Sequence, residues 1–425
     1  MPPRARTTSP GLTVLIAVAA LGVLFGALLR NAWLEDMEWK SDERRMFDDA
    51  LRVARGEPWP WVGMRSGVGT ANPGMSLWIF AALARLGDVE TPIGLARAVV
   101  VMNTLALALL ALFAATRRDE DEREAWLWAT TLACVSPSGV QLQRKIWAQS
   151  VLPLLSLATL TAWWYRRRRA GAFGWGLIGA CLGQIHMSGF FWAVALAGYT
   201  ALAERGAPRE DGSRTRWGSW LAGSLAGAWP LLPWARLALL QPGGSPTTHL
   251  FEPLHLGFWR HAAIDAAGAG TYFSLGRGNF GALLREPIIA GVPGYAVAAV
   301  QLTAVALTAL ALASGLRALA RAPGWRARLF GGGPTRLLQN TALLGYGGLI
   351  TASAIRFRPH YLLVLFPLVQ LALARAALAH PKGRRILAGL VAAQALLAAA
   401  FILQVHVRGG APGGDYGVSY RSQGR

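Results

Sequence analysis

Ionisable residues of both signs are concentrated in one short segment that follows an apolar run at residues 11–30. The segment reads SDERRMFDDALRVARGEPW, from Ser41 to Trp59. In a chain this apolar, an ionisable side chain is costly unless it faces a cavity or a partner. A carboxylate at a membrane surface can also accept the proton of an attacking hydroxyl group. Asp42 and Glu43 are therefore the first candidates for chemistry.

The same two acids have a purely structural interpretation. Ser41 is a good helix N-cap, and acidic residues stabilise the first turn of a helix. Asp48 and Asp49 follow nearly two turns later, and are predicted either to lie on a solvated face or to form ion pairs with Arg44, Arg45 and Arg52 at helical spacing.

Three further groups of residues could bind an anion. The first is Arg144–Lys145, the second is His186 in GQIHMSG, and the third lies in RFRPHYLLVLFP. Arginine and protonated histidine bind phosphate through charge-assisted hydrogen bonds. The alternatives are cations that extend to the membrane surface and a histidine with a structural role. The candidates of the third group are Arg356, Arg358, His360 and Tyr361.

The elements that must position these residues are membrane helices. Hydrophobic residues make up 53% of the 425 residues and charged residues only 15%, against about 25% in soluble proteins. Apolar runs of roughly 20 residues predict an all-α polytopic membrane protein with about eleven spans. They lie near 11–30, 93–116, 125–140, 148–165, 171–187, 189–203, 217–240, 290–318, 337–355, 360–379 and 386–406.

The distribution of basic residues predicts the orientation. The net charge is +20, but the basic residues lie between the apolar runs and not on one face, which argues against binding to nucleic acid. Placing the N-terminus inside puts nearly all dense arginine clusters in the cytoplasm. Residues 31–92 and 241–289 then form two extracytoplasmic loops.

The predicted domain organisation follows from these loops. Residues 1–406 form one transmembrane domain, and residues 407–425 a flexible C-terminal tail. The first loop is expected to carry two interface helices, at 42–55 and 72–87, because both stretches are amphipathic and too short to cross. The second loop, rich in Gly, Pro and His, is predicted to be an irregular loop or a lid over the bundle that could bind the acceptor.

No metal or nucleotide motif accompanies these candidates. His249, His255 and His261 recur at a spacing of six, which matches no tight metal-binding pattern. Cys134 and Cys181 lie within apolar stretches and indicate no disulfide. We therefore predict no metal ligands from the residues, and the cofactor stays unknown, with a divalent cation left open.

The first loop resembles that of GT-C glycosyltransferases, the integral-membrane enzymes that use polyprenyl-phosphate sugars. The closest resemblance is to family 39 types, such as protein O-mannosyltransferases and aminoarabinose transferases of lipid A. It is carried by Asp42-Glu43, ALRVARGEPW, Asn72-Pro73, Arg97 and the late segment RFRPHYLLVLFP. It covers residues 1–205 well and the rest only as a topology. Gln149 stands near a place where the family often has an acidic residue.

The resemblance implies a hexosyl or pentosyl transferase of the cell envelope, with inversion expected at the sugar. It implies a polyprenyl-phosphate sugar as donor and a lipid, glycan or protein as acceptor, on the extracytoplasmic side of a bacterial-type plasma (inner) membrane. Asp42 would be the general base, and Glu43, the second catalytic residue, would orient the acceptor or bind a cation. The residues Arg97, Arg144, Lys145, His186, Arg356, Arg358, His360 and Tyr361 would bind substrate. A flippase for lipid-linked glycans and a scaffold without catalysis remain alternatives.

Overall fold

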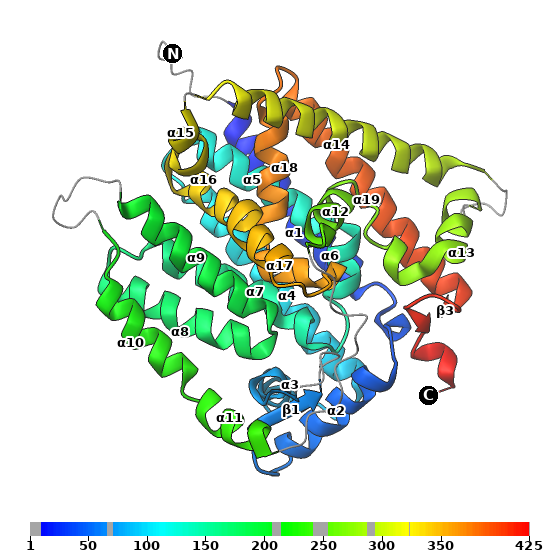
Figure 1. Cartoon of the computed structure of the whole chain (residues 1–425). Coiled ribbons are helices and arrows are strands. Elements are labelled where there is room, and N and C mark those ends of the chain that lie inside the picture. Colours follow the sequence, from blue (N-terminus) through cyan, green and yellow to red (C-terminus); the bar gives the residue numbers. More distant parts are fainter. Residues whose placement is uncertain are drawn as a thin grey trace.

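The fold is a bundle of helices with two small two-stranded sheets (Figure 1). The computed structural model describes residues 10–65, 71–205, 214–240, 254–286, 294–322 and 324–424. Strand β1 (Val62–Arg65) pairs with β2 (Ala71–Pro73) in the first loop, and β3 (Gly410–Ala411) pairs with β4 (Gly417–Val418) near the C-terminus. The all-α class predicted from the sequence is confirmed.

Four helices of the described chain are long and apolar enough to cross a membrane. They are α1 (Pro10–Asn31), α4 (Pro92–Ala115), α14 (Ala296–Ala320) and α19 (Gly383–Arg408). A fifth span is possible if the 3₁₀ helix η6 (Pro359–Leu365) and α18 (Leu368–Leu378), which are bent by 79°, count as one. The structure therefore does not confirm eleven spans.

The other predicted spans are divided or short. The run 125–140 is shared between α5 (Glu120–Val135) and α6 (Pro137–Leu142), because Pro137 starts a new helix that Ser136 caps. The run 217–240 is broken near Pro230, between α10 (Trp217–Ala228) and α11 (Leu231–Leu240). The remaining segments are η2 (Ala148–Val151), α7 (Leu152–Trp164), α8 (Arg169–Ile185), α9 (Ser188–Arg205), α15 (Gly324–Phe330), α16 (Gly333–Asn340), the π-helix η5 (Thr341–Tyr346) and α17 (Gly347–Ala352).

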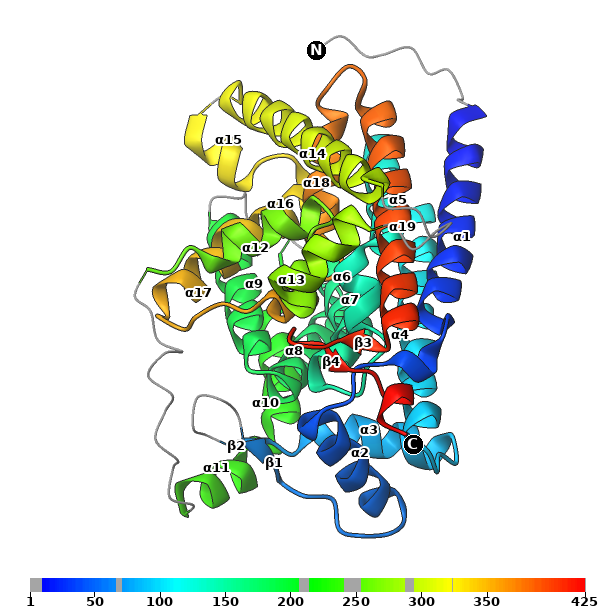
Figure 2. The ribbon, with the colours of Figure 1, turned by 90° about the vertical axis from the view of Figure 1, so that its right-hand side faces the viewer.

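The first loop forms a layer at one end of the bundle (Figure 2). It contains the 3₁₀ helix η1 (Leu34–Asp36), then α2 (Ser41–Ala54) and α3 (Met75–Leu86), which pack on each other. The start of α1 and the basic turn between α18 and α19 lie at the opposite end. Both helices predicted for this loop are present, and their place at a membrane surface stays a prediction.

Two loop predictions need correction. The second loop is not irregular where it is described, because it contains α12 (Gly257–Ala266) and α13 (Tyr272–Arg285). Residues 241–253 and 287–289 of that loop lie outside the described residues. The segment 409–424 is folded and not a flexible tail, since it forms β3, β4 and the 3₁₀ helix η7 (Arg421–Gln423) against the first loop.

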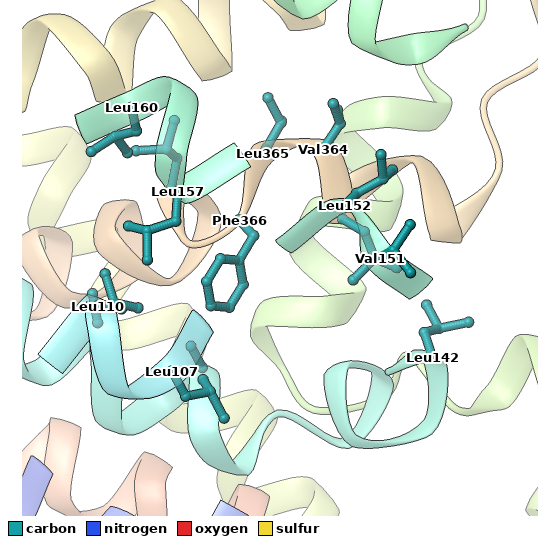
Figure 3. Close-up of a cluster of buried hydrophobic side chains, with 14 of the residues drawn as sticks. Leu107, Leu110, Leu142, Val151, Leu152, Leu157, Leu160, Val364, Leu365 and Phe366 are labelled. Carbon is teal, nitrogen blue, oxygen red and sulfur yellow. The ribbon is translucent and has the colours of Figure 1, made fainter. Parts of the chain in front are cut away.

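An apolar core fixes the late segment in the bundle. Leu107 and Leu110 of α4 and Leu157 of α7 face Phe366, which directly follows η6 (Figure 3). These side chains are almost completely removed from solvent. Burial of such side chains is worth about 1.5–3 kcal/mol each. The packing therefore holds η6, and with it His360, in a defined position.

Candidate functional site

Lys145 lies between two carboxylates of the first loop. Its Nζ is 2.8 Å from Oε2 of Glu38 and 2.9 Å from Oε1 of Glu43. The three side chains are only 4%, 3% and 1% exposed, in that order. Lys40 adds a second ammonium group, 2.6 Å from Oε1 of Glu38. Two negative and two positive groups thus compensate each other in what we call the acid–lysine network.

Local structure explains how these groups meet. Glu43 is the third residue of α2, and its Oε2 accepts a hydrogen bond from the Lys40 backbone amide at 3.0 Å, as in a capping box. The helix therefore begins with Lys40 and not Ser41 as its N-cap. Lys145 lies in the irregular turn between α6 and η2. Burial opposes its charge, but Glu38 and Glu43 outweigh burial and raise the pKa of Lys145 above its ordinary value.

A row of aromatic rings connects this network to the late segment. The Lys145 ammonium lies 4.1 Å from the ring centroid of Trp147, and that ring is 4.4 Å from the His360 ring. The His186 ring is 6.1 Å from His360 and 4.9 Å from Tyr361. His186 also shares a 2.6 Å hydrogen bond with Ser188. The structure thus brings together predicted residues from three distant parts of the sequence.

Positive charge continues beyond these rings into the second loop. Burial lowers the pKa of His261 to about 4, and the positive groups around it act in the same direction, namely Arg260, His255, Arg358 and Arg356. Arg356 is exposed and Arg358 is half-buried. Neither arginine forms an ion pair with a carboxylate of the described chain. We call Arg356, Arg358, His360, Tyr361 and His261 the basic–aromatic cluster.

Three predicted residues are not part of this assembly. Asp42 lies on the exposed face of α2, and Arg97 is exposed on α4, each without a contact to the residues above in the described structure. Arg144 is buried, and its Nη2 donates to the backbone carbonyls of Ala32 and Trp33 at 2.7 and 2.6 Å. Arg144 therefore holds the end of the first helix and does not face the rings.

Sequence reasoning missed Glu38, Trp147 and His261. Glu38 lies in MEWK, between the first span and α2, as a single acid outside the charged segment that begins at Ser41. Trp147 follows Lys145 by two residues, a spacing that could have indicated a cation over an aromatic ring. His261 belongs to no recognisable motif, since its spacing from His249 and His255 matches no tight metal-binding pattern. Among the residues that the structure describes, no group of three or more His, Cys, Asp or Glu side chains is placed to hold a metal ion.

The fold is that of GT-C membrane glycosyltransferases, as the resemblance predicted. The similarity is to the crystal structure of ArnT from Cupriavidus metallidurans bound to undecaprenyl phosphate, with a TM-score of 0.53 and 13% identity over 93% of this chain and 77% of that one. The apo state of the same ArnT gives a TM-score of 0.40, at 16% identity over 93% and 78%.

A third similar structure is the Archaeoglobus fulgidus oligosaccharyltransferase tethered with an acceptor peptide. It gives a TM-score of 0.47 and 11% identity, over 92% of this chain and 55% of that one. No family model and no curated protein sequence matches the chain. At these identities the similarity defines the fold, and function must be argued from the site.

Proposed function

We propose that the protein is a membrane glycosyltransferase that moves a sugar from a polyprenyl-phosphate donor to an extracytoplasmic acceptor. The observation that carries the proposal is the basic–aromatic cluster, whose arginines have no carboxylate partner in the described structure and whose rings reach Lys145. Arginines that have no carboxylate partner can bind a phosphate through charge-assisted hydrogen bonds. The undecaprenyl phosphate bound to ArnT is an anion of the required kind.

The reaction assigns a role to each half of the site. The acceptor hydroxyl attacks the anomeric carbon of the sugar, the bond from that carbon to the donor phosphate breaks, and polyprenyl phosphate leaves with the bonding electrons. Negative charge therefore grows on the phosphate as the bond breaks. Arg356, Arg358 and His360 would stabilise that charge, with His186 and Tyr361 beside them. Attack from the face opposite the phosphate would invert the configuration of the sugar.

The proposed general base is Asp42. Glu43 is bound by Lys145 and by the Lys40 amide, and Glu38 is bound by two lysines, so both carboxylates have their oxygens occupied by donors. Carboxylate oxygens that already face these donors are not free to receive the proton of an acceptor hydroxyl group. Asp42 is the neighbouring carboxylate, is open to solvent, and has no ion-pair partner in the described chain. The acid–lysine network would then support the helix start that carries Asp42.

The remaining proposals concern the approach of the donor, the acceptor, the membrane and the transferred sugar. Arg97, exposed at the start of α4, would meet the lipid phosphate as it approaches along the bundle. The acceptor would be a lipid, glycan or protein, and the membrane a bacterial-type plasma (inner) membrane with the site on its outer face. The transferred group would be a hexosyl or pentosyl unit.

The test compares Asp42→Asn with Asp48→Asn, an exposed aspartate of the same helix that serves as a matched control. Purified protein is incubated with a panel of polyprenyl-phosphate sugars and acceptors, and released polyprenyl phosphate is measured. Loss of a general base typically costs about 10²–10⁴-fold in rate. We expect such a loss in kcat for Asp42→Asn, with unchanged donor binding, and wild-type rates for Asp48→Asn.

Two results would change the assignment. Full activity in Asp42→Asn together with inactive Glu43→Gln would move the base to Glu43. Movement of lipid-linked glycan across vesicles without release of lipid phosphate would replace the transferase by a flippase.

A further inference from the structure

The C-terminal segment makes hydrogen bonds and ion pairs with the first loop. After α19 ends, Gly409 takes a left-handed conformation (φ 65°) and the chain turns back toward residue 36. At Gly410 an added Cβ would lie 2.4 Å from the Gly417 carbonyl oxygen, so the β3–β4 turn needs glycine there. We call residues 409–424 the C-terminal clasp.

The clasp is anchored to the second loop by hydrogen bonds to α13. The Tyr416 amide donates to the Ser274 carbonyl of α13 at 2.8 Å, and Asn279 donates to the Pro412 carbonyl at 3.0 Å. Ala411 and Tyr416 are buried with residues of α13 and α19. The bundle therefore fixes the position of the clasp, and the clasp can fix the position of the first-loop residues that it contacts.

What it touches is the strip of chain from Asp36 to Lys40. Two hydrogen bonds reach its backbone: the Tyr420 amide donates to the Met37 carbonyl at 3.0 Å, and the Gln423 side chain donates to the Trp39 carbonyl at 2.7 Å. Between them, Ser419 pairs with Glu38 in an isolated β-bridge. These contacts fix the backbone of the residue whose side chain binds Lys145.

Charged contacts reinforce the same strip. Asp36 is only 2% exposed, and its Oδ1 is 2.8 Å from Nε of Arg421. Its other oxygen lies 2.6 Å from Nδ1 of His406, at the end of α19. The Lys40 ammonium, which also binds Glu38, donates to the Asp415 carbonyl at 2.6 Å. A buried carboxylate held in this way is strongly destabilising when one partner is removed.

We propose that the C-terminal clasp is a positioning element for the reaction, with Arg421 as its main positioning residue. It touches no residue of the basic–aromatic cluster in the described structure, and it acts on Glu38 and on the Lys40 cap that starts α2. It thereby sets where the first-loop carboxylates stand relative to Lys145 and the donor. This inference rests on the proposed transferase function. Small displacements of reacting groups reduce rates strongly, by roughly 10²-fold for 1 Å.

The test uses the full chain with Arg421→Ala and Arg421→Lys. Arg408→Ala serves as the control, because Arg408 is a nearby half-exposed arginine that pairs with Glu286 and not with the first loop. We expect Arg421→Ala to lower kcat by about tenfold or more, with a donor KM within twofold of wild type. Arg421→Lys should recover part of kcat, since it restores the charge opposite Asp36.

Amide hydrogen exchange of residues 36–40 provides a second readout that needs no activity. We expect faster exchange there in Arg421→Ala than in Arg408→Ala. If wild-type protein lacks transferase activity, the proposed function fails, and the exchange result alone still tests the clasp. Unchanged exchange overturns the proposal. Faster exchange with unchanged kcat would also overturn it, and so would a raised KM with unchanged kcat. Either result would mean that the clasp has only a structural role.

Discussion

The two halves of the candidate site, the acid–lysine network and the basic–aromatic cluster, differ in whether their charges are compensated. In the acid–lysine network, two carboxylates and two ammonium groups neutralise one another within 2.9 Å, and Lys145, Glu38 and Glu43 are almost fully buried. In the basic–aromatic cluster, the arginines carry positive charge without a carboxylate partner in the described chain, and they are partly open to solvent.

This difference supports the proposal that the acid–lysine network stabilises the fold and that the basic–aromatic cluster binds the donor. Buried charges persist when partners and hydrogen bonds satisfy them, so a compensated network acts as a rigid support. Uncompensated cations beside aromatic rings are arranged to receive negative charge from outside. The comparison predicts that changes in the first half affect stability most, whereas changes in the second affect substrate binding.

Lys145→Ala should have the largest effect. It leaves Glu38 and Glu43 buried together without their shared ammonium group, a situation that costs about 3–5 kcal/mol. We expect a much lower yield of folded protein and a lower Tm in detergent. Lys382→Ala, which removes an exposed lysine at the other end of the bundle, should match wild type. An unchanged Tm in Lys145→Ala would mean that the network does not support the fold.

The double variant Arg356→Ala/Arg358→Ala should affect binding and spare the fold. A hydrogen bond to a charged group is worth about 1.5–3 kcal/mol, so the donor KM should rise by roughly tenfold or more. The Tm should stay level, because neither arginine has an ion-pair partner to lose among the described residues. Arg326→Ala, on the far α15, controls for loss of an arginine. A drop in Tm with unchanged donor KM would mean that the arginines stabilise the fold and do not bind the donor.

The smallest effect is expected from the titration of Asp265, which tests whether the basic–aromatic cluster has a charged carboxylate beside it. It lies one turn after His261 but is bonded to Ser138 and Gln370, and burial raises its pKa to about 6. Because the folded state then binds a proton more tightly than the unfolded chain, the free energy of unfolding should rise as pH falls from 7.5 to 5. The expected gain is about 1 kcal/mol and should be absent in Asp265→Asn.

The opposite pH trend would contradict this picture. Stability that fell on acidification, only in protein that carries Asp265, would mean that the carboxylate is charged and paired. The basic–aromatic cluster would then contain its own compensating acid, and the contrast between the halves would disappear.

The sequence predicted the fold class because apolar runs and basic connections are local patterns. It also predicted the helices around α2 and α3 from their amphipathic spacing. The predicted count of eleven spans is not confirmed, because hydropathy does not register breaks such as those at Pro137 and Pro230, where helices end although the residues remain apolar. The prediction of a flexible tail at residues 407–425 was wrong for 409–424, because glycines that permit a specific turn look the same in sequence as glycines in a mobile tail.

Which charged residues meet was decided only by the tertiary structure. The sequence by itself established an apolar helical chain, an acidic segment after its first span, and cations far downstream, since composition and spacing carry that information. It could not show that Glu43 faces Lys145 while Asp42 faces solvent, because adjacent residues on a helix point about 100° apart. Nor could it show that Glu38 is held from both sides, by Lys145 and by a chain end nearly 400 positions away. Such pairings depend on how distant segments pack, and no local pattern encodes them.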